Sequence, residues 1–235
     1  MKMRINKYLA KAGIGSRRGV EKFIVEGKVS INGKVVTDLS RDIQENDRVF
    51  LNGKEVQVRE DFIYYKINKP AGYTTTVKDP FAERVILDLI KEKRRIFPVG
   101  RLDNDSGGRL LLTNDGDLTY RLTHPKHHMS KTYRVRVKGA PSDAQIKKLE
   151  QGILMDGYKT KECVIKRIKD EQSETSFEVI LWEGRNRQIR KLFDSINHPV
   201  VFLKRIKIGE VLLGNLKEGQ YEELSTEELE YLRGI

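Results

Sequence analysis

Residues 100–116 read Gly-Arg-Leu-Asp-Asn-Asp-Ser-Gly-Gly-Arg-Leu-Leu-Leu-Thr-Asn-Asp-Gly. The first nine form a mostly polar, glycine-rich loop, and the three leucines at 110–112 form a short apolar run. Such a run between turn residues is typical of a buried strand. A carboxylate in a loop of this kind is usually a cap or a turn former, so the pattern alone does not single out Asp103. The loop also lacks the Gly-Lys-Ser/Thr ending of a phosphate loop.

Alternating and apolar segments on both sides of this loop predict further elements. Strands are expected at Ile63–Ile67, Arg109–Thr113, Tyr133–Val137, Val164–Ile168 and Phe177–Trp182. Helices are expected at Val85–Lys93, Asp117–Leu122, Ser142–Gln151, Arg187–Ile196 and Thr226–Leu232. Because strands and helices do not alternate strictly, we expect an α+β domain on a mixed, mostly antiparallel sheet over residues 60–235.

Residues 1–59 predict a separate small α-α-β domain. Asn6 and Ser16 are placed to cap two short helices that stop at Gly13 and Gly27. Asn-Gly pairs at 32–33 and 52–53 lie between apolar residues and predict two hairpins. The polar stretch at 58–61 is expected to be the exit linker.

The charge balance indicates a polyanionic partner. The chain has 45 Lys and Arg against 34 Asp and Glu, a formal charge of +11. No window is apolar over the length of a membrane span, and the charged N-terminus precedes no apolar signal region. Cys163 is the only cysteine, which excludes an intramolecular disulfide framework. We therefore expect a cytoplasmic protein without membrane association. We also expect it to act as a monomer.

A first group of basic residues lies at the start of the chain. Ser16-Arg17-Arg18 places two cations in the first turn of a helix, where they oppose the helix dipole unless they bind an anion. Arg4 and Lys7 lie at helical spacing and can share that face. For one such residue a solvated surface is the simpler interpretation, but the cluster favours RNA.

Over residues 1–50 the chain resembles the alpha-L RNA-binding domain found in ribosomal and tRNA-synthetase proteins. The resemblance is carried by residues 4–13, 16–18, 27–29 and 31–36. It implies binding of structured RNA, and it adds Asn6, Lys28 and Asn32 to the candidate RNA-binding residues.

Two further segments stand out in the longer domain. Asn-Lys-Pro-Ala-Gly-Tyr at 68–73 is a turn after a strand and is weak evidence alone. Glu-Gly-Arg-Asn-Arg-Gln-Ile-Arg at 183–190 places cations at a helix start, where Arg185 and Arg187 are candidate RNA ligands. A solvated surface is the alternative.

Together with the loop at 100–116 and Lys-Thr-Tyr at 131–133, these segments resemble the pseudouridine synthase family of the ribosomal small-subunit synthase A type. The resemblance runs from about Phe62 to the C-terminus. It implies that Asp103 is the catalytic aspartate, with Arg101 and Leu102 beside it. It also implies that Tyr133 packs on the target base and that Arg190 pairs with Asp103. Arg109 departs from the family, which usually has leucine there, and so does Glu-Arg-Val at 83–85.

The reaction implied is the isomerisation of a uridine in ribosomal RNA, or in an immature ribosomal subunit, to pseudouridine. It transfers no electrons and no group to a second molecule, so we expect no cofactor and no metal. The carboxylate can attack the sugar or the base, or act as a base, and the sequence leaves these open. A non-catalytic ribosomal RNA-binding or assembly protein is the main alternative.

Segments 75–80 and 124–128 look more like the large-subunit members of the family. The second holds three histidines, at 124, 127 and 128. With no matching cysteine or paired acid motif, an RNA-facing loop is favoured over a metal site.

Overall fold

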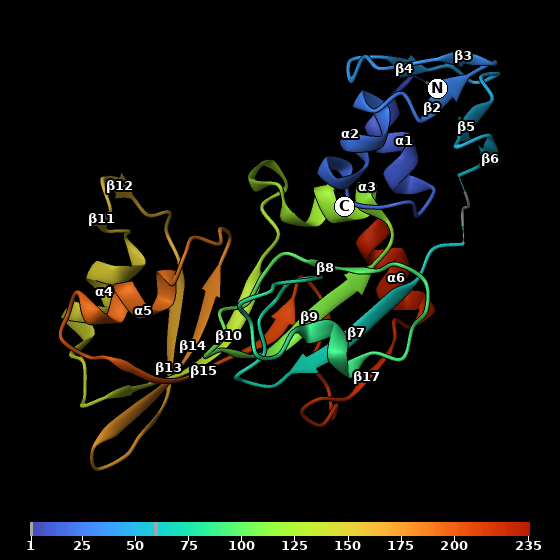
Figure 1. Cartoon of the computed structure of the whole chain (residues 1–235). Helices are drawn as coiled ribbons and strands as arrows, with labels where there is room; N and C mark the ends of the chain where they lie inside the picture. The colour runs from blue at the N-terminus through green and yellow to red at the C-terminus, as the bar shows by residue number, and fades with distance from the viewer. Residues whose placement is uncertain (1, 59–60) are drawn as a thin grey trace. The chain divides into compact units, whose positions relative to one another are not determined.

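The computed structural model describes residues 2–58 and 61–235, and its chain separates into two compact units (Figure 1). The first unit holds the chain up to Ile63, with Glu92–Ile96 and Asn114–Gly116, and the second holds the rest. The linker expected at 58–61 falls partly on residues outside the described ranges. No helix among the described residues is long and apolar enough to cross a membrane.

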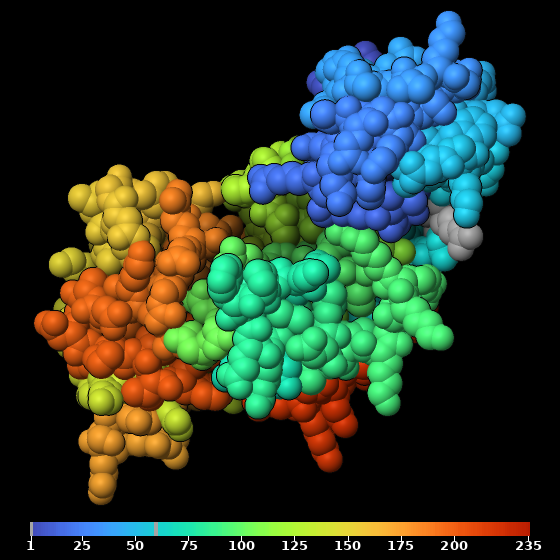
Figure 2. Space-filling model, in the orientation of Figure 1, coloured from blue at the N-terminus to red at the C-terminus, as the bar shows by residue number. Residues whose placement is uncertain are grey.

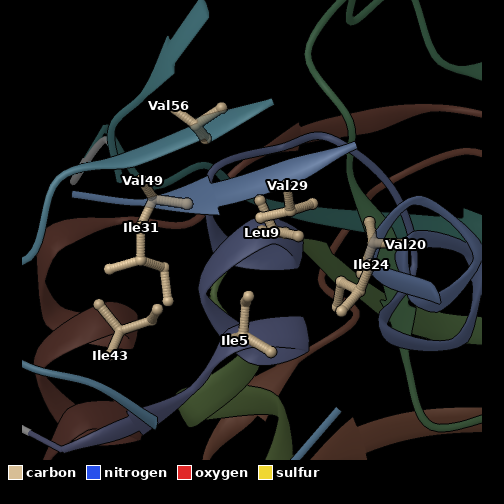
Figure 3. Close-up of a cluster of buried hydrophobic side chains, with 9 residues drawn as sticks. All are labelled: Ile5, Leu9, Val20, Ile24, Val29, Ile31, Ile43, Val49 and Val56. Atoms are coloured by element: carbon tan, nitrogen blue, oxygen red, sulfur yellow. The ribbon is translucent and has the colours of Figure 1, made fainter. Parts of the chain in front are cut away.

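The first unit has the predicted two helices followed by short strands. Its elements are β1 Met3–Arg4, α1 Ile5–Lys11, α2 Arg17–Val25, β2 Val29–Ile31, β3 Lys34–Val35, β4 Asp42–Ile43, β5 Val49–Leu51 and β6 Lys54–Val56. Strands β3-β2-β5-β6 form one sheet, and β1 pairs with β4. Figure 3 shows aliphatic side chains from both helices and from the strands gathered into one core.

Both Asn-Gly turns are confirmed, because each pair has positive φ angles and joins two antiparallel strands. Ser16 caps α2 as predicted, since its Oγ accepts a hydrogen bond from the Gly19 N–H at 2.9 Å. The cap predicted at Asn6 is wrong. Helix α1 begins two residues earlier than a cap at Asn6 implies, at Ile5, and the Asn6 amide instead donates to Glu21 of α2 at 2.9 Å.

The second unit is built on a nine-stranded sheet with the main order β13-β14-β10-β15-β9-β7-β17. Strand β16 pairs with β15 and β8 with β9. Among the strand pairs of this sheet in residues 61–235, only β9–β15 is parallel. The strands are β7 Tyr64–Lys69, β8 Phe97–Val99, β9 Gly107–Thr113, β10 Lys131–Lys138, β13 Val164–Asp170, β14 Glu174–Leu181, β15 Val200–Ile208, β16 Val211–Leu212 and β17 Tyr221–Glu223. A separate hairpin joins β11 Leu154–Met155 to β12 Tyr158–Lys159. The α+β fold with a mostly antiparallel sheet is confirmed.

The helices of the second unit are α3 Gly116–Thr123, α4 Asp143–Glu150, α5 Gln188–Asp194 and α6 Thr226–Arg233, with single 3-10 turns η1 Ile86–Leu89 and η2 Pro125–His127. Figure 1 shows α4 and α5 together beside β13 and β14. The helix predicted at Val85–Lys93 is wrong. Only Ile86 in η1 is buried, and Ile90 is already extended, so no second turn has an apolar contact to hold it.

Arg109, the departure from the family pattern, is fully buried on β9. Its Nη2 lies 3.0 Å from Glu228 of α6, and Lys66 of β7 contacts the same carboxylate at 2.7 Å. Burial lowers the pKa of Arg109 to about 10. A buried guanidinium needs such a partner, so this ion pair fixes α6 against the sheet where a leucine would make only apolar contact.

Candidate active site

A cavity of about 340 Å³ lies in the second unit. Its walls come from the loop that ends β8, the stretch from α3 into β10, the end of hairpin β11–β12, the loop from β14 into α5, and β15. Six predicted site residues line it, namely Arg101, Leu102, Asp103, Tyr133, Arg185 and Arg187. The fold therefore brings together side chains from positions up to 86 residues apart in the chain.

Lys69 holds the loop that carries Asp103. Its side chain is fully buried at the end of β7, and Nζ donates to the carbonyl oxygens of Asp103 at 3.1 Å and Ser106 at 2.7 Å. It also reaches the carbonyls of Pro70 at 3.1 Å and Asn104 at 3.3 Å. Burial lowers the pKa of Lys69 to about 8, although the nearby carboxylates of Asp105 and Asp103 oppose the shift. One ammonium group thus fixes the path of the Asp103 loop.

The segment that follows Lys69 adds further hydrogen bonds to the same loop. Thr75 Oγ1 donates to the Leu102 carbonyl at 2.7 Å, and the Gly72 N–H donates to the Asn104 carbonyl at 2.8 Å. Asn104 in turn donates to Thr74 Oγ1 at 3.2 Å. The segment at 68–73, weak as a sequence signal, therefore supports the candidate catalytic loop together with Thr74 and Thr75.

We expect Lys69→Met to destabilise the second unit by about 3 kcal/mol, because buried carbonyls lose their donor. The difference in unfolding free energy between wild type and Lys69→Met also depends on pH. Since the folded pKa lies below the unfolded value, the unfolded wild type binds more protons between about pH 8 and 10.5, and its stability rises with pH there. The gap between wild type and Lys69→Met should widen across that window in urea unfolding. A gap that stays constant from pH 7 to 10.5 would contradict the buried ammonium.

Arg190 does not pair with Asp103, and this prediction is corrected. Its Nη2 lies 3.1 Å from the Asp105 carboxylate and donates to the Asp105 carbonyl at 3.2 Å, while Nη1 donates to the Val200 carbonyl at 3.2 Å. Arg187 contacts the same Asp105 carboxylate at 3.2 Å. Burial alone would raise the pKa of Asp105, but the two arginines outweigh it and hold that pKa below its ordinary value. The reason is geometric, since the first turn of α5 faces the loop two residues past Asp103.

Two cations of the cavity were missed, namely Arg205, which is buried, and Lys131, which is half-buried. Arg205 of β15 is 3% exposed, and its Nε donates to the Arg109 carbonyl at 2.7 Å. Its Nη2 is buried without a hydrogen-bond partner among the described residues. Burial and Arg205 lower the pKa of Lys131 to about 8. Arg205 lies opposite Tyr133 in the β10–β15 register, so both side chains stand on the cavity face of the sheet. No local signal marks Arg205, because its inward position breaks the alternation of apolar and polar residues expected of a strand.

The close approach of β9 to β15 requires a glycine. Gly108 has φ +105°, and a Cβ there would overlap the backbone of Arg205. This contact places Arg205 next to the loop that precedes β9.

The RNA-binding candidates of the first unit lie mostly on its surface. Arg17, Arg18 and Lys28 are exposed. Arg4 lies 3.7 Å from Asp42, and Asn32 supports its turn by donating to Asp47 at 2.7 Å. Asn6, Ser16 and Asn32 thus have structural contacts of their own, and Lys7 is partly buried.

Two of the three histidines at 124–128, His124 and His127, form an aromatic group with Tyr120 beside the cavity. The rings of Tyr120 and His124 lie 4.7 Å apart, and His124 lines the cavity. Within the described residues no group of histidine, cysteine and acidic side chains is arranged to hold a metal ion.

Comparison with known proteins gives consistent matches. Residues 63–195 match the family described as RNA pseudouridylate synthase, and residues 3–49 match the S4 domain. The chain is 40% identical to the ribosomal large subunit pseudouridine synthase B of Bacillus subtilis, over 99% of this chain and 96% of that protein. It is also 40% identical to an uncharacterized RNA pseudouridine synthase of Aquifex aeolicus, over 99% and 94% of the two chains. A crystal structure of a pseudouridylate synthase matches with a TM-score of 0.71 and 31% identity, covering 98% of this chain and 99% of that one.

Proposed function

The chain belongs to the RNA pseudouridylate synthase family and carries an S4 domain, and from that premise we propose that it isomerises a uridine of large-subunit ribosomal RNA. The observation that carries the proposal is the placement of Asp103 in a cavity whose other walls hold Tyr133 and several cations. RNA binding alone does not require the Asp103 carboxylate in a cavity whose cations attract phosphate.

The residues of the cavity can perform each part of the reaction. The bond from N1 to C1′ breaks, the base turns and C5 joins C1′. The proton on C5 then passes to a base and on to water, and N1 takes up a proton, so the product is an isomer of the substrate. Because the base stays in the site and no water enters, one ionised carboxylate suffices where a glycosidase needs two. We assign that role to Asp103, and we assign to Arg101, Leu102 and Arg190 the support of its loop.

The substrate is drawn to the site by the basic surfaces. We propose that the exposed cations of the S4 domain and Arg185 and Arg187 of the catalytic domain bind RNA phosphates. The choice of the large subunit follows the printed name of the Bacillus subtilis relative. Action as a monomer in the cytoplasm stays a prediction.

The test is tritium release from RNA labelled at uridine C5. Large-subunit RNA, small-subunit RNA and immature subunits of both kinds are incubated separately with the protein. We expect release from large-subunit substrate only. Release from the small-subunit substrate alone would overturn the subunit assignment, and no release from any of them would favour the non-catalytic alternative.

Tyr133 is proposed to stack on the target base. Base–aromatic stacking is worth about 1–3 kcal/mol per base, which offsets part of the cost of flipping the uridine out of its stack. Tyr133→Phe should keep most of the turnover, and Tyr133→Ala should lower kcat/KM by about ten- to hundredfold. Tyr133 is 8% exposed, so thermal melting of both variants must accompany the kinetics. Equal activity in two folded variants would remove Tyr133 from the mechanism.

A further inference from the structure

Glu183 is a second carboxylate in the cavity, and its oxygens are already occupied. It follows β14 with a side chain 9% exposed. It accepts hydrogen bonds from Gln188 Nε2 at 2.5 Å, from the Lys161 backbone N–H at 3.1 Å and from the Tyr158 hydroxyl at 3.2 Å. A carboxylate with three donors is a fixed structural centre, and it is poorly placed to exchange protons with a substrate.

Arg185 lies against this centre with one face covered. Its Cζ is 3.3 Å from the centroid of the Tyr158 ring, well inside the distance of about 6 Å that defines a cation–π contact. Its ion-pair contact among the described residues is Nε to Glu183 at 3.8 Å, which is beyond hydrogen-bonding distance. The side chain is 48% exposed and lines the cavity. The guanidinium is therefore oriented by its neighbours while its N–H groups remain available.

The hairpin that supplies Tyr158 is itself held in place. Thr160, just after β12, is buried, and its Oγ1 accepts a hydrogen bond from the Ile153 N–H at 3.0 Å. At the tip, Asp156 forms an ion pair with Lys191 of α5. In Figure 1 the hairpin β11–β12 lies next to α4, and α5 lies beside α4. Tyr158 is thus fixed at both ends of its short hairpin.

We propose that Tyr158 and Glu183 are positioning residues that hold Arg185 as the ligand of a backbone phosphate at the nucleotide entering the cavity. This inference rests on the proposed RNA substrate. A guanidinium binds phosphate through two parallel N–H bonds, and orienting it beforehand reduces the entropy lost on binding. Because Arg185 covers that face of the Tyr158 ring, a nucleobase cannot stack on it. The neighbouring cations Lys161 and Arg187 also line the cavity and favour an anion there.

The test measures affinity for large-subunit ribosomal RNA, transcribed in vitro, over a range of salt concentrations. Each phosphate contact contributes a slope of about 0.7–0.9 in log K against log salt. Arg185→Ala should lower the slope by about one contact and the affinity by about tenfold. Tyr158→Ala should lower the slope by the same amount although tyrosine carries no charge, because Arg185 is no longer held. A role limited to stability would leave the slope unchanged.

Matched variants separate the outcomes. Tyr158→Phe keeps the ring and should keep the slope, and Leu154→Ala, on the same hairpin at a side chain 76% exposed, should behave as wild type. If Tyr158→Ala has a much lower melting temperature than wild type, Tyr158→Leu is used in its place. It should also lose the cation–π contact with Arg185. A wild-type slope for Arg185→Ala would contradict the assignment of Arg185 as a phosphate ligand. A wild-type slope for a folded Tyr158→Ala or Tyr158→Leu would contradict the positioning role of Tyr158. RNA binding does not require turnover. If no tritium is released, the proposed function is contradicted, but the salt dependence of binding still tests the role of Arg185 and Tyr158.

Discussion

Asp103→Asn is expected to abolish tritium release, with turnover reduced by about 10³-fold or more, while RNA binding stays within a few-fold of wild type. An asparagine amide has the size of the carboxylate and can neither attack carbon nor take up the C5 proton. The loop should keep its path, because Lys69 binds the backbone carbonyls of this segment and not the Asp103 carboxylate. Loss of activity can then be attributed to the side chain itself.

The measurement compares wild type and variant side by side on the same labelled RNA. Asp143→Asn is the control, since that carboxylate is 98% exposed on α4 and lies outside the cavity lining. Near-normal release by a folded Asp103→Asn would show that another group performs the chemistry. Loss of RNA binding along with turnover would mean that Asp103 organises the site and would leave its chemical role unsupported.

Much of the fold follows from local signals in the sequence. The alternation at Tyr133–Val137 predicts a half-buried strand, and in β10 buried and exposed residues alternate from Tyr133 to Lys138. The Ser142 and Gln145 pair predicts a capping box, and both of its hydrogen bonds are present at α4. These signals succeed because each depends on residues close together in the chain.

Strand β15 was missed for a physical reason. Its nine residues include Lys204, Arg205 and Lys207, so the expected alternation of apolar and polar side chains is broken where Arg205 points inward. Lys69 was passed over for the same reason, because a fully buried lysine is rare and needs partners that sequence cannot show. In both cases the exception to the pattern is a cation at or beneath the cavity, where function overrides the usual rule.

The partner of Arg190 could not be read from the sequence either. A motif places an arginine in the first turn of a helix, but it does not say which of two aspartates, two residues apart, faces that turn. The structure assigns the contact to Asp105, whose carboxylate also receives Arg187. This changes the expected role of Arg190 from direct partner of the catalytic carboxylate to support of its loop.

Arg190→Lys is therefore expected to lower kcat by about ten- to hundredfold while KM changes little. The two Nη groups of Arg190 join Asp105 on one side to the Val200 carbonyl on the other, and a single lysine Nζ cannot span both. The loop of Asp103 then loses its tie to β15, and small displacements of a reacting group are costly. Because Arg190 is not among the residues that line the cavity, substrate affinity should be affected less than turnover.

A double-mutant cycle identifies the partner. If Arg190 acts through Asp105, the effects of Arg190→Lys and Asp105→Asn on kcat should be strongly non-additive, since either change alone breaks the same contact. The cycle of Arg190→Lys with Tyr133→Phe should be close to additive, because those side chains share no contact in the structure described. Additive effects of Arg190→Lys and Asp105→Asn would contradict action through Asp105 and favour a direct contact of Arg190 with Asp103. Near-normal turnover of Arg190→Lys would show that Arg190 does not support catalysis.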